Sequence, residues 1–303
     1  MPEMIGNAKI NDQFYSGVDG YSDGDIEDEL LNLVTNNSDV MEILAAEKRW
    51  PILYHLSPVR QNILEWYPFR EGAEVLEVGS GCGAITGVLC RKAGQVTCIE
   101  LSKRRSLINI NRNKEYSNLE IMVGNFNDIR LDKKYDYITL IGVMEYAGYY
   151  TSSESPFVSF LENIKKMLKP DGKLLIAIEN KFGLKYWAGA REDHTGVYFD
   201  GIEGYHATES QVRTFSKDEL TKIIRDAGYS AIEYYYPFPD YKFPTQIFSD
   251  DYMPKADDLI CSRDSFDNSR VHLFDETMVY KNIIDADKFD FFSNSFFVEV
   301  GIE

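Results

Sequence analysis

A glycine-rich turn is the clearest chemical feature of the sequence. In the stretch VLEVGSGCGAITGVL, an apolar run ends at Val78 and is followed by Gly79, Gly81 and Gly83. Glycines between a strand and a helix accept positive φ angles and let backbone N–H groups approach a ligand closely. The turn therefore predicts a ligand-binding site where this strand ends.

An acidic residue closes the next apolar run. The segment VTCIE ends at Glu100, and a carboxylate at this position can accept hydrogen bonds from both hydroxyls of a ribose. The turn and the acid together predict a cofactor that contains a nucleoside. Two cofactor classes remain open, because Gly79, Gly81 and Ala84 also satisfy the dinucleotide fingerprint GxGxxG/A.

Glu77 discriminates between these two classes. It stands shortly before Gly79, where its carboxylate is expected beside the turn. A carboxylate there repels the pyrophosphate of NAD in a desolvated site and attracts a cationic amino-acid moiety. The sequence therefore favours a cofactor with an amino-acid part, and an NAD-dependent oxidoreductase is kept as an alternative.

A long irregular segment supplies candidate catalytic residues. Residues 181–206, KFGLKYWAGAREDHTGVYFDGIEGYH, follow neither strand nor helix periodicity, although they are rich in glycine and aromatic residues. Loops of this length in compact domains are usually functional. Removal of a proton from a substrate hydroxyl is done best by a base with a pKa near neutrality, so His194 and His206 are candidates, although REDHTG also suits an ordinary turn with an exposed histidine. The acidic residues that can orient a histidine or replace it are Asp193, Glu203 and Glu145.

Short apolar runs alternate with segments of helical periodicity from Glu74 onward. Five runs are predicted to be buried strands, at residues 73–79, 95–101, 119–125, 135–143 and 172–180. Strands that alternate with helices pair in parallel and form a doubly wound sheet. A helix capped by Ser216 and Glu219 follows, and residues 231–248 and 291–300 are predicted as two strands that close the sheet.

The combination ExGSGCG, followed by a strand that ends in an acid, resembles motif I and its successor in class I S-adenosylmethionine-dependent methyltransferases. The resemblance covers residues 74–180 and includes VGNFNDI, YDYITLIGVMEY and LKPDGKLLIAIEN. It implies an α/β, Rossmann-like fold with a doubly wound, mostly parallel, seven-stranded sheet. It also implies S-adenosylmethionine as the cofactor.

The resemblance assigns roles to individual residues, with Asn125 standing where the family usually has an acid. Those implied for the methionine part and its turn are Glu77, Gly79, Ser80, Gly81 and Gly83. Those implied for the ribose and adenine are Glu100, Leu101, Asn125 and Phe126. Those implied beside the sulfonium and the acceptor are Ile141, Gly142 and Glu145.

The chain is expected to divide near residue 70. Residues 1–70 are predicted to form an acidic arm and helices that cover the cofactor, where Tyr54 can contribute and Arg60 can pair with the methionine carboxylate or lie in solvent. Residues 71–303 are predicted to form the methyltransferase domain, with a substrate loop at 181–215. An acidic insertion at 249–290 has no assigned structure.

A narrower resemblance concerns the acceptor. The segments ENKFGLKYWAGAREDHTGVYFDGIEGY, RTFSKDEL and FSNSFFVEV are similar to those of a bacterial methyltransferase group associated with polysaccharide biosynthesis and glycosyltransferases. The resemblance implies O-methylation of a saccharide or glycan intermediate and association with glycosyltransferases. Alternatives are another small molecule or a protein side chain as the acceptor, and a non-catalytic scaffold that binds the cofactor.

Composition limits the partners that we expect. The net charge of −17 argues against nucleic acid and against anionic membrane surfaces, so a small-molecule or glycan substrate is favoured. The absence of a signal segment and of a long apolar run predicts a cytoplasmic protein with no membrane span. Reduced thiols and no metal are expected, because the cysteines show no CxxC pairing and no histidine at zinc-ligand spacing; they are Cys82, Cys90, Cys98 and Cys261.

Overall fold

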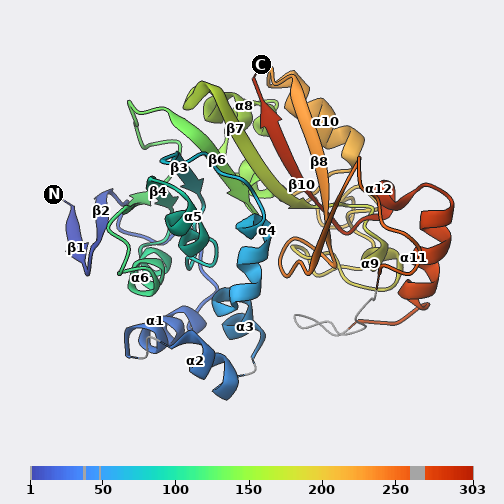
Figure 1. The fold of residues 1–303 in the computed structure, drawn as a ribbon, viewed down its shortest axis with the longest axis horizontal. Helices are drawn as coiled ribbons and strands as arrows, with labels where there is room; N and C mark the ends of the chain where they lie inside the picture. The colour runs from blue at the N-terminus through green and yellow to red at the C-terminus, as the bar shows by residue number, and fades with distance from the viewer. Residues whose placement is uncertain (1, 37–38, 48, 260–269, 303) are drawn as a thin grey trace. The chain divides into compact units, whose positions relative to one another are not determined.

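The computed structural model describes residues 2–36, 39–47, 49–259 and 270–302 (Figure 1). The chain folds into two compact units. Unit 1 comprises residues 1–140 and 167–173, and unit 2 comprises residues 141–166 and 174–303. Two strands, β6 (Tyr135–Ile141) and β7 (Leu168–Glu179), have residues in both units.

Unit 1 begins with two strands that the sequence did not predict. Strands β1 (Glu3–Ile5) and β2 (Ala8–Phe14) form an antiparallel hairpin, and β2 pairs in parallel with β5 (Leu119–Gly124). At Gly6, φ is 61° and an added Cβ would lie 2.4 Å from the Lys114 carbonyl oxygen. The hairpin was missed because its residues are largely polar and exposed, which hides the apolar alternation of a strand.

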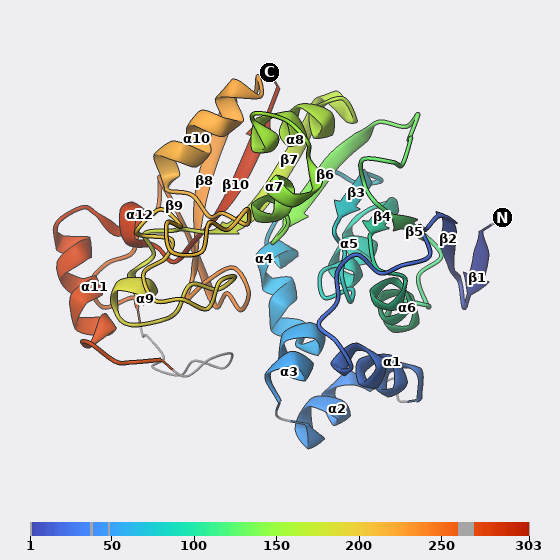
Figure 2. The same cartoon turned by 180° about the vertical axis from the view of Figure 1, so that it is seen from behind.

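Short helices follow the hairpin. They are α1 (Ile26–Asn36), α2 (Val40–Ala46), α3 (Trp50–Leu56), the 3₁₀ helix η1 (Pro58–Gln61) and α4 (Asn62–Glu65). The Ser57 side chain caps η1 by accepting a hydrogen bond from the Val59 N–H. Both views of the fold show α1 beside α6 (Lys103–Arg112) (Figures 1 and 2).

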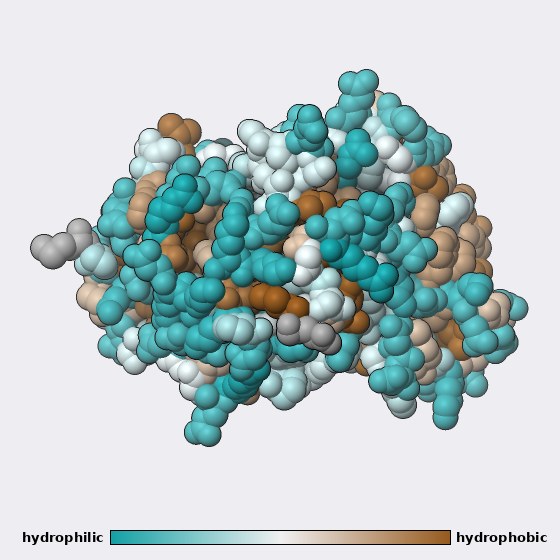
Figure 3. Space-filling view, turned by 90° about the horizontal axis from the view of Figure 1, so that it is seen from above, coloured by the Kyte–Doolittle hydropathy of each residue, from teal (hydrophilic) through white to brown (hydrophobic). Residues whose placement is uncertain are grey.

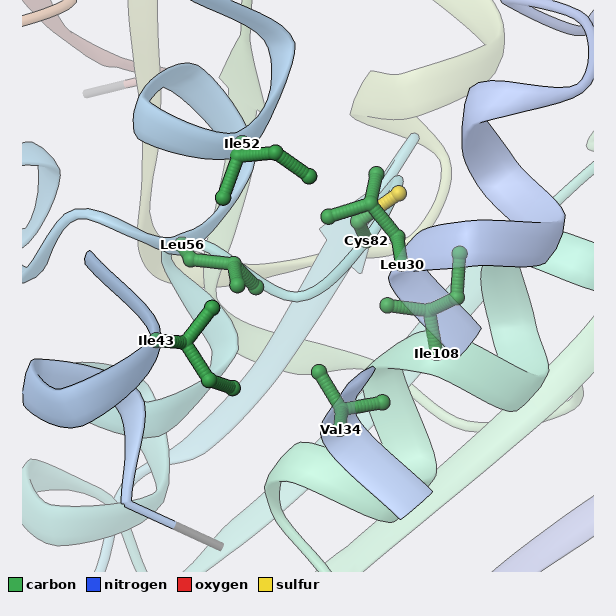
Figure 4. Packing of buried hydrophobic residues seen from close by; sticks show 7 residues of the cluster. All are labelled: Leu30, Val34, Ile43, Ile52, Leu56, Cys82 and Ile108. Carbon is green, nitrogen blue, oxygen red and sulfur yellow. The ribbon is translucent and has the colours of Figure 1, made fainter. Parts of the chain in front are cut away.

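The helical segment of unit 1 shares a hydrophobic cluster with the glycine turn. Side chains from α1, α2 and α3 pack with Cys82 of the turn and with Ile108 of α6 (Figure 4). The members from the three N-terminal helices are Leu30, Val34, Ile43, Ile52 and Leu56. The helical segment therefore packs directly on the turn that we predicted to bind a ligand.

The strands of unit 1 have the predicted alternating pattern. In chain order the elements are β3 (Glu74–Val78), α5 (Thr86–Lys92), β4 (Gln95–Glu100), α6, β5 and β6. The strand order is β1-β2-β5-β4-β3-β6, and every pair from β2 to β6 is parallel. The chain reverses direction across the sheet between β3 and β6, and open α/β sheets bind ligands at such a switch point.

Unit 2 contains the end of β7 and three later strands in the order β7-β10-β8-β9. Its strands after β7 are β8 (Ala231–Phe238), β9 (Gln246–Ser249) and β10 (Ser295–Gly301), and β8 pairs antiparallel with both others. Its helices are η2 (Met144–Tyr146), α7 (Ala147–Tyr150), α8 (Pro156–Lys165), α9 (Leu184–Trp187), α10 (Lys217–Asp226), α11 (Glu276–Asp285) and α12 (Phe289–Phe292). The capping box of Ser216 and Glu219 at α10 is confirmed.

The predicted fold class is confirmed at the level of a Rossmann-like sheet, but the strand count of seven is wrong. The described residues form ten strands, because β1 and β2 are additional and the predicted strand 231–248 is two strands, β8 and β9. The segment between β8 and β9 contains Pro239 and Pro244, which lack the N–H group that a continuous strand requires. Residues 291–300 likewise divide into the end of α12 and β10.

The face shown in Figure 3 is mostly hydrophilic, and the described cysteines are buried. Hydrophilic residues cover most of the face in Figure 3, in line with a mean hydropathy of −0.32. None of the helices within the described ranges is long and apolar enough to cross a membrane. The side chains of Cys82, Cys90 and Cys98 are buried free thiols, and Cys261 lies outside the described residues.

Candidate active site

The glycine turn after β3 has the backbone geometry that the sequence predicts. The φ angles of Gly79, Gly81 and Gly83 are 69°, 52° and 77°. A Cβ added at Gly81 would have no atom within 4 Å, so the backbone there borders open space. A Cβ added at Gly83 would lie 2.3 Å from Asn109 Oδ1, so this glycine allows close packing against α6. Gly81 therefore leaves room for a ligand, and Gly83 has a packing role.

Glu100 holds the turn from the end of β4. Its Oε2 accepts a hydrogen bond from the Gly81 N–H at 2.8 Å, and its Oε1 accepts one from the Ser102 N–H at 2.9 Å. Burial raises the pKa of Glu100 above its usual value, although the charge of Arg105 and these two hydrogen bonds oppose the shift. The carboxylate that we predicted to meet the ribose thus also fixes the position of the glycine backbone.

Glu77 lies in a buried polar network beneath the turn. Its Oε2 accepts hydrogen bonds from Thr86 Oγ1 at 2.6 Å and from Cys98 Sγ at 3.2 Å. Burial raises the pKa of Glu77 to about 7, because the two hydrogen bonds only partly offset desolvation. Asn109 extends the network by donating to Ser80 Oγ and Thr86 Oγ1 at 3.1 and 3.0 Å.

Sequence reasoning missed Thr86, Cys98 and Asn109 as members of this network. Thr86 and Cys98 lie in apolar runs where a polar contact gives no periodic signal. Asn109 lies on the buried face of α6.

Arg60 is a buried cation with unused hydrogen-bonding capacity. Its Nη1 donates to the Tyr54 carbonyl oxygen at 3.4 Å, and its guanidinium lies 4.0 Å from the centroid of the Tyr54 ring. Its Nε has no hydrogen-bond partner, and no carboxylate within the described ranges forms a salt bridge with it. The predicted alternative of a solvent-facing Arg60 is therefore wrong, since only 6% of the residue is exposed.

A second, half-buried arginine lies close to Arg60. Arg112 donates from Nη1 to the carbonyl oxygens of His55 and Cys82, at 2.6 and 2.7 Å. Burial lowers the pKa of Arg112 to about 10, and the nearby charge of Arg60 contributes to the decrease. The region beside the glycine turn thus holds the buried Arg60 and the half-buried Arg112, and the carboxylate of an amino-acid moiety would satisfy the free donor of Arg60.

The remaining predicted residues of unit 1 lie at the carboxyl ends of β4 and β5. Leu101 is half-buried, and a Cβ added at Gly20 would lie 3.0 Å from its Cδ2, so the N-terminal segment passes over it. Asn125 and Phe126 are also half-buried, and Asn125 Oδ1 accepts a hydrogen bond from the Asn127 N–H at 2.9 Å. Because β4 and β5 are parallel neighbours, these residues lie at the same edge of the sheet as Glu100.

Unit 2 begins with two residues that the sequence placed beside the acceptor. Val78 pairs with Leu140 in the parallel ladder of β3 and β6, and Ile141 is the next residue along the chain. Gly142 follows with φ of 70°, and its N–H donates to the Ala177 carbonyl oxygen of β7 at 2.9 Å. A Cβ added at Gly142 would lie 2.8 Å from the Tyr241 hydroxyl oxygen, so only glycine fits this position.

His194 lies between two carboxylates of unit 2. Its Nδ1 is 3.1 Å from Glu192 Oε1, and its Nε2 is 3.6 Å from Glu145 Oε1. Burial acts to lower the pKa of His194, but the two carboxylates outweigh it and hold the pKa well above its usual value. The structure thus brings together His194 and Glu145, which are 49 residues apart in the sequence (194 minus 145).

Glu192 is a site residue that sequence reasoning missed. Its Oε2 accepts hydrogen bonds from the N–H groups of His194 and Thr195, both at 2.7 Å, and its Oε1 accepts one from the Tyr205 hydroxyl at 3.2 Å. These bonds fix the carboxylate and thereby the ring of His194. Its position two residues before a candidate histidine was the available signal, because short acidic turns often fold back on their own backbone.

A network of ion pairs surrounds this group. Lys242 Nζ lies 2.7 Å from Glu179 Oε1 and 2.8 Å from Asp193 Oδ1, and Lys185 Nζ lies 2.8 Å from Asp193 Oδ2. Burial acts to raise the pKa of Asp193, but the two lysines hold it well below its usual value. Asp193 therefore pairs with lysines, and Glu192 is the residue that orients His194.

Two carboxylate oxygens in this network remain without a hydrogen-bond partner. They are Glu145 Oε2 and Glu179 Oε2, and both are buried. One ligand atom from each of Glu145, Glu179 and His194 lies within 4.8 Å of the others. Burial raises the pKa of Glu145, although its contact with His194 opposes the shift. The arrangement can accept a proton, bind hydroxyl groups or hold a cation.

His206 differs from His194 in its exposure to solvent. Its side chain is exposed, whereas the preceding residue, Tyr205, is buried and bonds to Glu192. The structure therefore places one of the two candidate histidines of the substrate loop among buried carboxylates and the other at the surface.

Comparison with known proteins identifies similar sequences. A family model described as a methyltransferase domain matches residues 76–174. An uncharacterised methyltransferase of Staphylococcus carnosus is 31% identical over 157 residues, which cover 51% of this chain and 69% of that protein. A demethylmenaquinone methyltransferase of Tropheryma whipplei is 32% identical over 105 residues, which cover 35% of this chain and 41% of that protein.

Solved structures include similar folds at low sequence identity. A putative methyltransferase from Haloferax volcanii, in complex with the Trm112 methyltransferase activator, has a TM-score of 0.49 and 18% identity. That match covers 91% of this chain and 97% of the other. Phosphoethanolamine N-methyltransferase 1 of Haemonchus contortus has a TM-score of 0.47 and 17% identity, covering 72% of this chain and 45% of that one.

Proposed function

Because the chain belongs to the S-adenosylmethionine-dependent methyltransferase family, we propose that it methylates a hydroxyl group of a saccharide or glycan intermediate. Its cofactor is S-adenosylmethionine, which supplies the electrophilic methyl group. Family membership sets aside the NAD-dependent oxidoreductase. The acceptor class is the part of the proposal that requires its own support.

The residues of unit 1 fit the cofactor. The open space at Gly81 admits a ligand against the backbone, and Arg60 offers its free Nε to the methionine carboxylate. Glu100 lies at the end of β4, where a carboxylate can accept hydrogen bonds from ribose hydroxyls, and each of its oxygens has a second lone pair. Asn125 and Phe126, at the end of β5, are proposed to contact the adenine.

The observation that carries the proposed acceptor chemistry is the position of Glu145 beside His194. A hydroxyl that attacks a methyl group loses its proton in the reaction, and a positioned carboxylate or imidazole can take it. Glu145 is buried, its Oε1 faces His194 Nε2, and Glu192 fixes the imidazole from the other side. We assign proton acceptance to Glu145 and orientation of Glu145 to His194.

A saccharide suits the polar character of this group. Saccharides present several hydroxyl donors, and the free oxygens of Glu145 and Glu179 are hydrogen-bond acceptors. The aromatic ring of Tyr146 packs edge-on against His194, with centroids 5.5 Å apart, and adds an apolar surface. In a polysaccharide-building system, a glycosyltransferase reaction would supply such an acceptor.

An acceptor panel tests the proposal. Release of S-adenosylhomocysteine from S-adenosylmethionine is measured with nucleotide sugars and oligosaccharides, with quinols and small amines, and with protein acceptors. The proposal predicts turnover with a saccharide and a decrease of about 100-fold or more in Glu145→Gln, the size expected when a general base is lost. Turnover only with a non-saccharide acceptor would overturn the acceptor class. A scaffold would bind S-adenosylhomocysteine and show no turnover with any acceptor.

A further inference from the structure

The three side chains of Glu145, Glu179 and His194 have the composition and spacing of a metal-ligand set. From each residue one imidazole nitrogen or carboxylate oxygen lies within 4.8 Å of the other two. The ligand atoms of one tetrahedral cation are about 3.5 Å apart at bond lengths of roughly 2.1 Å. His194 Nε2 and Glu145 Oε1 are already 3.6 Å apart. Small side-chain rotations would therefore bring the three residues to bonding distance.

Two independent features point to a ligand at this place. Glu145 Oε2 and Glu179 Oε2 are buried and lack any hydrogen-bond partner, although buried carboxylate oxygens are normally satisfied. His194 Nδ1 is held by Glu192 Oε1, which leaves Nε2 as the ring nitrogen that faces Glu145. A carboxylate that orients a histidine in this way is the usual outer partner of a metal-binding histidine.

The network carries an excess of negative charge, which a divalent cation would neutralise. Glu145, Glu179, Glu192 and Asp193 supply four negative charges, and Lys185 and Lys242 supply two positive ones. When His194 is a metal ligand its imidazole is neutral, and the balance is then −2 (two minus four). Lys242 binds Glu179 through Oε1 and leaves Oε2 free, so the lysine and a cation can share this carboxylate.

We propose that Glu145, Glu179 and His194 bind one divalent transition-metal cation, with Glu192 as the residue that orients His194. The donor set of one imidazole nitrogen and two carboxylate oxygens suits Mn²⁺, Fe²⁺, Co²⁺ or Zn²⁺. Three protein ligands leave coordination positions for an oxygen of the acceptor. This last role rests on the proposed methyltransferase function, whereas cation binding itself does not.

Cation binding also agrees with the proton acceptance assigned above. Glu145 has two carboxylate oxygens, so one can coordinate the cation while the other receives the proton of an acceptor hydroxyl. The site departs from the sequence prediction of no metal, which considered the zinc-ligand spacing of the cysteines. Glu145, Glu179 and His194 come from three separate segments of the chain, so no local spacing reveals them.

Calorimetric titration of the full chain with MnCl₂ and, separately, ZnCl₂ tests the site after dialysis against a chelator. We expect one cation per chain, loss of measurable binding in His194→Ala and Glu179→Gln, and about 10- to 100-fold weaker binding in Glu192→Gln. The matched controls are His272→Ala and Glu162→Gln, which remove an exposed histidine and an exposed carboxylate. Binding in the controls should equal that of the wild type.

A second measurement tests the site even if the substituted variants fail to fold. The visible absorption spectrum of Co²⁺ added to the wild-type protein reports nitrogen and oxygen ligation without any substitution. Absence of stoichiometric binding by all three cations, or equal binding in a folded His194→Ala variant, would overturn the site. Methyl transfer that persists in chelator would refute only the role of the cation in the reaction. Cation binding without methyl transfer to any saccharide would refute the acceptor class alone.

Discussion

At the residue scale, buried carboxylates of the two units differ in what surrounds them. Glu77 has hydrogen-bond donors but no salt-bridge partner within the described ranges, and burial raises its pKa to about 7. Asp193 is flanked by Lys185 and Lys242, and its pKa is held well below the usual value. Glu77 therefore changes its protonation near neutral pH, whereas Asp193 stays charged and holds the substrate loop through its two lysines.

The raised pKa of Glu77 predicts a pH dependence of stability. A carboxyl with a higher pKa in the folded chain stabilises the fold below its unfolded pKa, near 4.5, and this contribution is lost as pH rises through 7. The wild type should lose about 3 kcal/mol of unfolding free energy between pH 5 and 8 relative to Glu77→Gln. Urea unfolding of both proteins at several pH values measures this difference. Parallel pH profiles would contradict the assignment.

Arg60 predicts which part of the cofactor unit 1 recognises. Loss of a charge-assisted hydrogen bond costs about 1.5–3 kcal/mol, so Arg60→Ala should bind S-adenosylhomocysteine about 10- to 100-fold more weakly. Methylthioadenosine lacks the amino-acid part and should bind the variant and the wild type alike. Calorimetry with both ligands on the same preparation separates this role from a folding defect. An equal decrease for both ligands would show that Arg60 acts only through the fold.

At the element scale, the N-terminal helices support the cofactor turn. Helices α1, α2 and α3 bury side chains in the same cluster as Cys82, which lies between Gly81 and Gly83 (Figure 4). Polar contacts extend this support, because Arg112 of α6 donates to the carbonyl oxygens of both His55 in α3 and Cys82 in the turn. Packing of these helices and geometry of the turn are thus coupled within unit 1.

Removing a central side chain of this cluster tests the coupling. Leu30 is fully buried, so Leu30→Ala should lower the unfolding free energy by about 2–5 kcal/mol. Met41 on the neighbouring helix α2 is 62% exposed, and Met41→Ala should change stability by about 0.5 kcal/mol or less. Denaturant unfolding provides both values. Similar costs for the two variants would mean that the cluster does not anchor the segment.

Elements with strong local signals were predictable from the sequence. The β3 turn, the acid that ends β4 and the capping box of α10 each depend on residues close together in the chain. Strands β1 and β2 were not predicted. Strand β2 is stabilised by pairing with β5, which is distant in the sequence, and such tertiary pairing cannot be recognised from the residues of a short polar segment alone.

At the scale of the whole molecule, the chemical groups are distributed over the two units. Unit 1 contains the glycine turn, Glu100 and Arg60, and unit 2 contains Glu145 and His194. The predicted domain boundary near residue 70 remains a prediction. The two compact units of the structure are instead divided after residues 140, 166 and 173. The group in unit 2 could be predicted only in part, because Lys242 reaches Glu179 and Asp193 from positions far along the chain.

The most direct test of the proposed function is the fate of a labelled methyl group. The wild-type protein is incubated with S-[methyl-¹³C]adenosylmethionine and a pool of saccharide acceptors, and the product is analysed by NMR. The proposal predicts a ¹³C-methoxy resonance on a saccharide, greatly reduced for Glu145→Gln under the same conditions. A labelled methyl group on nitrogen or carbon, or an equal methoxy signal from the variant, would contradict it.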